Sequence, residues 1–160
     1  MSRALKYIFP AMIAFVALSW SGCTDPKMVI DQNTQINNHN WPYTNKIKFT
    51  VKIDDERVPY NLLLNLRVTG DYKYSNMFVL IRQTDPDKKT TSTRFEVKLA
   101  DPDGEWLGKG SGNLYSYQMP FRTNYTFPAK GNYTIEIEQN MRDNPLREVS
   151  DVGLRVERAQ

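Results

Sequence analysis

Two residue types that carry much of the redox, metal and nucleophilic chemistry of proteins are nearly missing from this sequence. It has one cysteine, Cys23, and one histidine, His39. A single cysteine cannot form an internal disulfide, and a lone histidine among asparagines has no neighbouring ligand for a metal. No histidine or cysteine is placed to activate a nucleophile, so we predict no catalytic residue, no metal site and no cofactor. Only a pair of carboxylates far apart in the sequence stays open as a catalytic arrangement.

The sequence also lacks the runs of like charge and the basic stripes that mark nucleic-acid-binding proteins. The formal net charge of the whole chain is +3, with 21 basic and 18 acidic residues. Two of the basic residues, Arg3 and Lys6, fall within residues 1–22, so the rest of the chain has 19 basic residues against 18 acidic ones, a net charge of +1. We therefore predict no nucleic-acid partner.

A long hydrophobic run is absent as well. The apolar stretch of residues 7–18 is shorter than the roughly 20 residues that a membrane-spanning helix needs. It follows two basic residues and precedes the small residues Ser21 and Gly22, an order typical of an export signal. We predict that residues 1–22 are a signal peptide, whose removal from the 160 residues leaves 138, near the usual size of one domain.

The small residues before Cys23 resemble the bacterial lipobox, in which the cysteine receives a diacylglyceryl group and then an acyl chain such as palmitate. Trp20 stands where that motif usually has an aliphatic residue. We predict lipidation of Cys23, because two or more acyl chains hold a protein stably on a membrane. The alternatives are an ordinary buried thiol behind a terminal helix, or a plain secretory signal. Lipidation implies the bacterial cell envelope, either the outer membrane or the periplasmic face of the inner membrane.

Residues 23–45 are polar, rich in asparagine and glutamine, and only weakly periodic. We predict a lipidated tether and lead-in segment here, because regularly spaced apolar residues are too few for a helix. A short first strand at residues 28–30 is compatible with this interpretation. Trp41 is expected to lie against the edge of the following domain.

From residue 46 onward, apolar and polar residues alternate with the period of a half-buried strand. Turn-forming residues separate these segments at intervals of about ten residues. The predicted strands are centred on residues 47–53, 60–68, 77–83, 94–99, 114–121, 133–137 and 152–156. The run LLLNL at 62–66 also fits a helix, but Val68, Thr69 and Gly70 favour a strand. The pattern predicts an all-β domain over residues 46–160, an antiparallel β-sandwich of the immunoglobulin-like or jelly-roll-like kind.

Two loop motifs resemble ligand sites. Lys109 lies among glycines, but only three residues separate Gly104 from Gly108, and a glycine follows the lysine where a P-loop has serine or threonine. Asp101 and Asp103 resemble the start of a calcium loop without its further carboxylates and closing glutamate. We therefore expect neither a nucleotide site nor a calcium site here.

A group of aromatic residues lies close together in the sequence. Its members are Tyr115, Tyr117, Phe121, Tyr125 and Phe127. Such planar rings can stack on sugars, but aromatic residues are also common in strands and pack in cores. We favour core packing and keep a glycan-binding platform as the alternative.

The closing segment has turn formers at residues 140–145, followed by Leu146 and Val149, which we predict to be buried anchors. Its charged residues are expected to form a cluster of ion pairs that fixes the loop, with a partner-binding surface as the alternative. They are Arg142, Asp143, Arg147 and Glu148. A final strand then directs alternate apolar residues into the core. These are Val152, Leu154 and Val156.

Several parts of the chain also carry a family resemblance: EQNMR at 138–142, NPL at 144–146, DVGLRVE at 151–157, the GKGSG loop at 108–112 and the lipobox at Cys23. Together they resemble the GldH family of gliding-motility lipoproteins. Arg147 and Glu148 stand where such proteins commonly have Pro-Gly. The resemblance implies an exported lipoprotein associated with the gliding machinery and the linked type IX secretion apparatus, and it implies no catalytic residues.

Two function classes follow. The leading hypothesis is a non-enzymatic accessory or structural component of a gliding or secretion assembly, held on the membrane by its lipid and bound to machinery proteins. The alternative is a glycan- or peptide-binding lipoprotein of the cell envelope, motivated by the aromatic residues.

Overall fold

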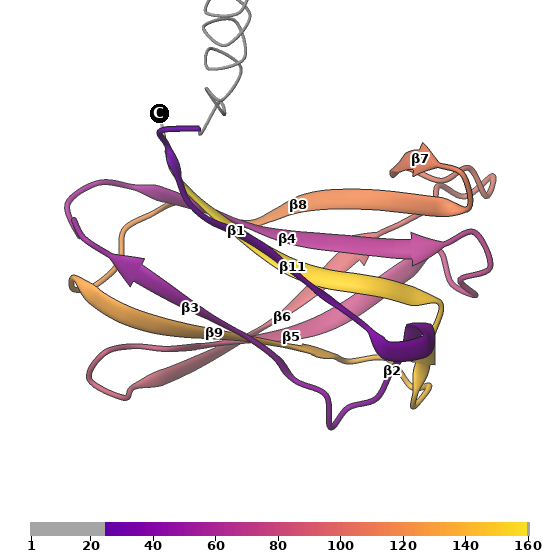
Figure 1. The fold of residues 1–160 in the computed structure, drawn as a ribbon, viewed down its shortest axis with the longest axis horizontal. Coiled ribbons are helices and arrows are strands. Elements are labelled where there is room, and N and C mark those ends of the chain that lie inside the picture. The colour runs from indigo at the N-terminus through magenta and orange to yellow at the C-terminus, as the bar shows by residue number, and fades with distance from the viewer. Residues whose placement is uncertain (1–24, 160) are drawn as a thin grey trace, which may run out of the picture.

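The computed structural model describes residues 25–159, which form two antiparallel β-sheets packed face to face (Figure 1). One sheet has the strand order β1-β11-β4-β8-β7, the other has the order β3-β9-β5-β6, and β10 pairs with β2 in a small third sheet. The strands are β1 (Met28–Gln35), β2 (Asn40–Trp41), β3 (Ile47–Ile53), β4 (Tyr60–Thr69), β5 (Asn76–Thr84), β6 (Thr90–Lys98), β7 (Lys109–Ser111), β8 (Leu114–Tyr125), β9 (Gly131–Gln139), β10 (Leu146–Arg147) and β11 (Val149–Arg158). A single 3-10 turn, η2 (Asn37–His39), precedes β2. The predicted antiparallel sandwich is confirmed.

The alternating segments place their apolar residues between the two sheets. In β3, Ile47, Phe49, Val51 and Ile53 are buried, whereas the residues between them are exposed. In β4 the run LLLNL forms a strand and not a helix, with its even-numbered leucines fully buried. Residues 77–83 lie in β5, an interior strand with β9 on one side and β6 on the other.

Phe127 lies at the centre of an aromatic cluster between the sheets. Its ring centroid is 5.4 Å from that of Tyr60, 4.9 Å from that of Tyr125 and 4.6 Å from that of Tyr133. Two of these contacts are edge-to-face, the arrangement that the aromatic quadrupole favours. The C-terminal part of the predicted aromatic group therefore packs in the core.

The sandwich begins earlier in the chain than residue 46. β1 pairs with β11 from Met28 to Gln35, so much of the expected lead-in segment is an edge strand of the five-stranded sheet. The sequence pattern was weak because most β1 side chains face solvent, and only Ile30 is buried within the strand. Backbone hydrogen bonds and polar contacts hold β1, among them the 2.8 Å bond from Asn65 Nδ2 to Asp31 Oδ1. Trp41 is fully buried and pairs with Leu146 in the small sheet of β2 and β10.

The last strand is an interior one. β11 lies between β1 and β4, and Val152, Leu154 and Val156 are fully buried, as predicted. Between β6 and β8 lie the short strand β7 and an isolated bridge between Ala100 and Trp106. The start of β1 and the small sheet of β2 and β10 lie at opposite ends of the long axis (Figure 1).

Candidate functional site

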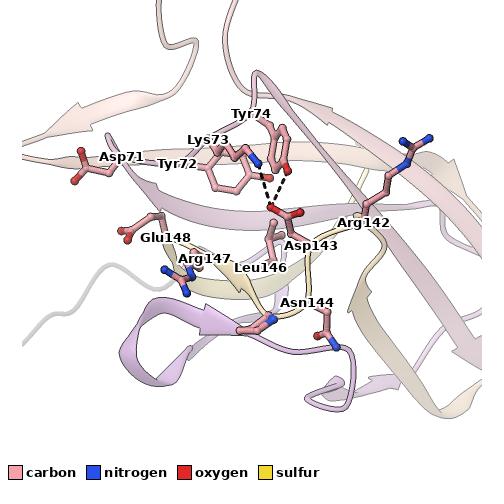
Figure 2. Close-up of a pocket in the computed structure, with 11 residues that line it drawn as sticks. Asp71, Tyr72, Lys73, Tyr74, Arg142, Asp143, Asn144, Leu146, Arg147 and Glu148 are labelled. Atoms are coloured by element: carbon pink, nitrogen blue, oxygen red, sulfur yellow. Dashed lines mark hydrogen bonds and ion pairs between the residues drawn. The ribbon is translucent and has the colours of Figure 1, made fainter.

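A cleft of about 490 Å³ opens at the end of the sandwich that carries β10. Its walls come from the loop after β4 (residues 71–74) and from the loop between β9 and β11 (residues 142–148), as Figure 2 shows. We call it the Asp143 cleft. The lining residues are Asp71, Tyr72, Lys73, Tyr74, Arg142, Asp143, Asn144, Pro145, Leu146, Arg147 and Glu148.

The two walls are joined at Asp143. The hydroxyl of Tyr74 donates a 2.7 Å hydrogen bond to Asp143 Oδ2, and Lys73 Nζ lies 3.6 Å from the same oxygen. The hydrogen bond from Tyr74 is the main reason that the pKa of Asp143 is lowered; partial burial acts against it, and the charge of Lys73 adds to the lowering. Asp143 is therefore an ionised acceptor whose Oδ2 already has partners.

The loop that carries Asp143, residues 140–145, is held by the side chain of Gln139, which is fully buried. Its Nε2 donates to the carbonyl oxygen of Asp143 at 3.0 Å, and its Oε1 accepts the backbone N–H of Met141 at 2.9 Å. A buried amide that is satisfied in this way fixes the loop, because breaking either bond would leave a polar group without a partner.

Glu148 adopts a left-handed backbone conformation with φ of +67°, which is uncommon for a residue with a side chain. Two contacts with Thr69 hold it there. The Thr69 N–H donates to the Glu148 carbonyl oxygen at 3.0 Å, and the Thr69 hydroxyl donates to Glu148 Oε2 at 2.7 Å. Glycine adopts this φ without strain.

The floor of the cleft is apolar. Leu146 is buried, as predicted, and pairs with Trp41 through β10 and β2. Val149 is also buried. Tyr72 is buried with its hydroxyl donating to the Asn76 carbonyl oxygen at 3.2 Å, and burial raises the pKa of this tyrosine well above its ordinary value. These residues anchor the two walls to the core.

The predicted ion-pair cluster within the closing loop is wrong. Asp143 pairs with Lys73 and Tyr74, and Glu148 pairs with Thr69, so both acids have partners from around the end of β4. Arg142 and Arg147 are exposed, and among residues 25–159 neither has an ion pair within 4.0 Å. Figure 2 shows their guanidinium groups on either side of Asp143, both directed away from it. The cleft thus presents two arginines without ion pairs beside two acids, Asp143 and Glu148, that already have partners.

The sequence did not indicate Lys73 and Tyr74 as site residues. Tyr74 and Asp143 are 69 positions apart. A lysine and a tyrosine in a short loop are unremarkable in sequence, and only the sheet order brings that loop beside residue 143.

The other candidate residues have structural roles. Tyr115 stacks on Trp106 with ring centroids 5.0 Å apart. The Tyr117 hydroxyl donates to the Leu99 carbonyl oxygen at 2.7 Å, and burial raises the pKa of Tyr117 to about 12. Phe121 contacts Phe95, with centroids 6.1 Å apart. Tyr117 and Phe127 are buried, and the half-buried Tyr115, Phe121 and Tyr125 each contact another ring of the protein, so the five do not form one exposed glycan platform.

The aspartate motif at residues 101–105 forms a hydrogen-bonded turn. Asp101 Oδ1 accepts the backbone N–H groups of Asp103 and Glu105, which is the bonding of an ordinary turn. Within residues 25–159 no group of three or more histidine, cysteine, aspartate and glutamate side chains could hold a metal ion. Over the same residues no helix is long and apolar enough to cross a membrane. Cys23 lies outside the described residues.

Comparison with known proteins agrees with the extent of the folded domain. The family model described as GldH lipoprotein matches residues 28–156, from the first residue of β1 almost to the end of β11. The gliding motility lipoprotein GldH homolog of Christiangramia forsetii is 32% identical over 152 residues, which cover 91% of this chain and 92% of the relative. The gliding motility lipoprotein GldH of Flavobacterium johnsoniae is 27% identical over 140 residues, covering 83% and 86%. No solved structure matches the chain significantly. The chain belongs to the GldH lipoprotein family.

Proposed function

We propose that this protein is a lipid-anchored, non-catalytic accessory or structural component of a bacterial gliding assembly and of the linked type IX secretion machinery. Membership of the GldH family carries the proposal, because the relatives are named gliding motility lipoproteins. The lipid is attached at Cys23, and the domain stands on the outer membrane or on the periplasmic face of the inner membrane. Its partners are proteins of the assembly.

The geometry near the anchor supports a fixed orientation. Asp25, two positions after Cys23, accepts a hydrogen bond of 2.7 Å from Arg155 Nη2 in β11. The polar tether between the lipid and the sandwich is then very short. β1 runs from this end toward β2, and its eight residues span roughly 26 Å at about 3.3 Å each. The Asp143 cleft, at the far end of the domain, would face away from the membrane that holds the lipid.

The chemistry of the cleft supports recognition of a protein rather than a reaction. Asp143 and Glu148 are bound by Tyr74, Lys73 and Thr69, while Arg142 and Arg147 are exposed. The third lining acid, Asp71, is exposed and accepts a 3.5 Å hydrogen bond from Asn113 at the rim. Guanidinium groups with free donors bind carboxylates in bidentate geometry. An acidic segment of a machinery protein is the partner that this arrangement fits.

Affinity isolation of the full-length protein from native membranes, with mass spectrometry of the bound proteins, tests the proposal. Gliding-machinery proteins should co-purify with the unaltered protein and decrease with the double variant Arg142→Ala, Arg147→Ala. Arg57→Ala is the matched control, because Arg57 is an exposed arginine in the loop between β3 and β4, at the other end of the sandwich. If folded protein in the membrane fraction co-purifies with no machinery component, the proposal is wrong.

A second candidate function, glycan binding, is favoured by a polar groove of about 650 Å³ on the outer face of the five-stranded sheet. Gln118 Nε2 donates to Asn65 Oδ1 at 3.0 Å, and Asn65 Nδ2 donates to Asp31, so amides and a carboxylate form a row across the strands. Such groups hydrogen-bond sugar hydroxyls. Binding on a glycan array that is lost in Gln118→Ala, with the fold intact, would support this function over the first.

A further inference from the structure

The outer edge of the four-stranded sheet is formed by β6, which has only β5 as a neighbour. The two strands pair from Asn76↔Lys98 to Thr84↔Thr90 without a bulge. Eight consecutive positions, Thr90 to Val97, include only one buried residue, Val97, and Phe95 is half-buried. β6 is therefore a long, regular and accessible edge.

The hydrogen-bond pattern shows which backbone groups of β6 are free. The Leu99 N–H donates to the Ser75 carbonyl oxygen at 2.8 Å, and the Phe78 carbonyl oxygen accepts the Asn140 N–H at 2.8 Å on the β9 side of β5. Because paired and unpaired positions alternate in antiparallel strands, the odd-numbered residues of β6 bond to β5. The even-numbered residues, such as Ser92 and Glu96, point their N–H and C=O groups to the free edge.

Side chains that commonly protect such an edge are turned away from it. Arg94 Nε donates to Asn140 Oδ1 at 2.9 Å, and its guanidinium carbon lies 3.7 Å from the centroid of the Phe78 ring. Glu96 Oε1 accepts a hydrogen bond from Asn76 at 2.8 Å. Charged residues blunt an edge strand when they extend over it, and these two extend back across the sheet.

The remaining edges are less open. β1 has a register irregularity between Met28 and Ile30 and lies against β3, so the two sheets meet along that side. β7 has only three residues. β6 lies on the other side of the sandwich from β1 and β3. Its residues Thr91 and Thr93 share the inward face with Phe95 and Val97, yet both are exposed, so no strand of the other sheet covers them. The sandwich is therefore uncovered beside β6.

We propose that β6 binds an extended segment of a partner protein by strand addition. Backbone groups of the segment would pair with the free groups of Ser92, Arg94 and Glu96. Alternate apolar side chains would cover Phe95 and Phe121, whose rings are 6.1 Å apart and half-buried. The other side chains would include a carboxylate opposite Lys98, which is exposed and has no ion pair among residues 25–159.

The anchor argues against a second copy of this chain as the occupant. Two copies pairing antiparallel through β6 about a two-fold axis would direct their two N-terminal ends in opposite directions. Both ends carry the proposed lipid on a short tether, so the two could not stand upright on one membrane. A segment of a different protein meets no such constraint. The inference rests on the proposed function in requiring a partner protein and in using the lipid anchor to exclude a second copy.

Site-specific photocrosslinking of the full-length protein in native membranes tests the proposal. A photoreactive phenylalanine analogue is placed at Ser92, Arg94 and Glu96 in turn, and at Thr50 of β3 as the control on the other edge strand. We expect adducts with one protein from the three β6 positions and none from Thr50. The crosslinked residue on that protein should move by two positions for each two-residue step along β6, as paired strands require.

Ser92→Pro gives a second measurement, because it removes an outward N–H and leaves the bonds to β5 in place. In the Ser92→Pro variant the yield of the adduct formed from position 96 should fall by about tenfold or more, while the melting temperature stays within about 2 °C of the parent. Ser92→Ala, the control, should change neither the adduct yield nor the melting temperature. If the proline variant does not fold, the crosslinks from positions 92, 94 and 96 test the proposal by themselves. Adducts of the chain with itself, adducts without a two-residue register, or none from β6 would overturn strand addition. Machinery proteins that still co-purified would leave the proposed function standing.

Discussion

The hydroxyl of Tyr74 lies 2.7 Å from Asp143 Oδ2 and joins two loops that are 69 residues apart in sequence. This bond joins the two walls of the Asp143 cleft, and the guanidinium groups of Arg142 and Arg147 point away from the carboxylate (Figure 2). Its effect on protonation can be tested directly.

Tyr74→Phe should raise the pKa of Asp143 toward its ordinary value. The pKa is lowered in the folded state, so the stabilisation is fully present above the unfolded-state pKa and is lost as pH falls through the folded-state pKa. The variant should thus melt below the parent at neutral pH, and the difference should shrink in acid. Carboxyl NMR titration and thermal melts measure both effects. Tyr72→Phe is the control, because it loses a hydrogen bond to Asn76 and should leave the pKa of Asp143 unchanged. An equal rise of the Asp143 pKa in both variants would contradict the role given to the Tyr74 hydrogen bond.

Gly153→Ala should destabilise the domain. A Cβ at this position would lie 2.0 Å from Asn33 Oδ1 and 2.4 Å from the Gln32 carbonyl oxygen. Overpacking of this kind costs about 1–3 kcal/mol, and the backbone oxygen cannot move aside as a side chain can. Chemical denaturation measures the loss. Gly110→Ala is the matched control, since its Cβ would meet only Tyr115 at 3.4 Å, and equal stabilities of the two variants would refute the steric argument.

Glu148→Ala should be less stable than Glu148→Gly by about 1 kcal/mol. Both variants lose the hydrogen bond from the Thr69 hydroxyl, but glycine tolerates the φ of +67° that alanine does not. Comparing the free energies of unfolding of the two variants isolates the backbone term. An alanine variant as stable as the glycine variant would mean that the loop changes conformation when Thr69 loses its partner.

Deletion from Asp151 onward should unfold the mature domain, whereas deletion of residues 159–160 should be tolerated. The longer deletion removes an interior strand with Val152, Leu154 and Val156, each worth roughly 1.5–3 kcal/mol on burial. That sum is a large share of a typical stability of about 5–15 kcal/mol. Circular dichroism melts distinguish the outcomes. A cooperative melt of the longer deletion within about 2 °C of the parent would show that β11 is not required.

Cys23→Ser should move the protein from the membrane fraction to the soluble fraction, because lipidation requires the thiol and acyl chains provide the binding energy. Fractionation followed by immunoblotting measures the shift. Mass spectrometry of the variant must show that the signal peptide is removed, since an uncut signal would itself hold the chain on the membrane. A processed variant that stays with the membrane would contradict anchoring at Cys23.

The sequence alone indicated most of the strands. Period-two alternation is a local property of neighbouring side chains, and in β3 it gave the buried face residue by residue. Leu146 and Val149 were also identified as anchors from a local signal, because apolar residues next to turn formers are usually buried. The motifs of the closing segment, together with the GKGSG loop and the lipobox, likewise indicated the GldH family, which the family model confirms.

The tertiary structure decided what the strands lie beside. β1 could not be recognised from its polar side chains, since its place depends on backbone pairing with β11. The charges of the closing loop were seen in the sequence but assigned the wrong partners, because Lys73, Tyr74 and Thr69 reach them only through the order of strands in the sheets. Alternation fixes which face a residue occupies. Register and sheet order, set by packing across many tens of residues, fix its neighbours, and through them the cleft and the free edge of β6.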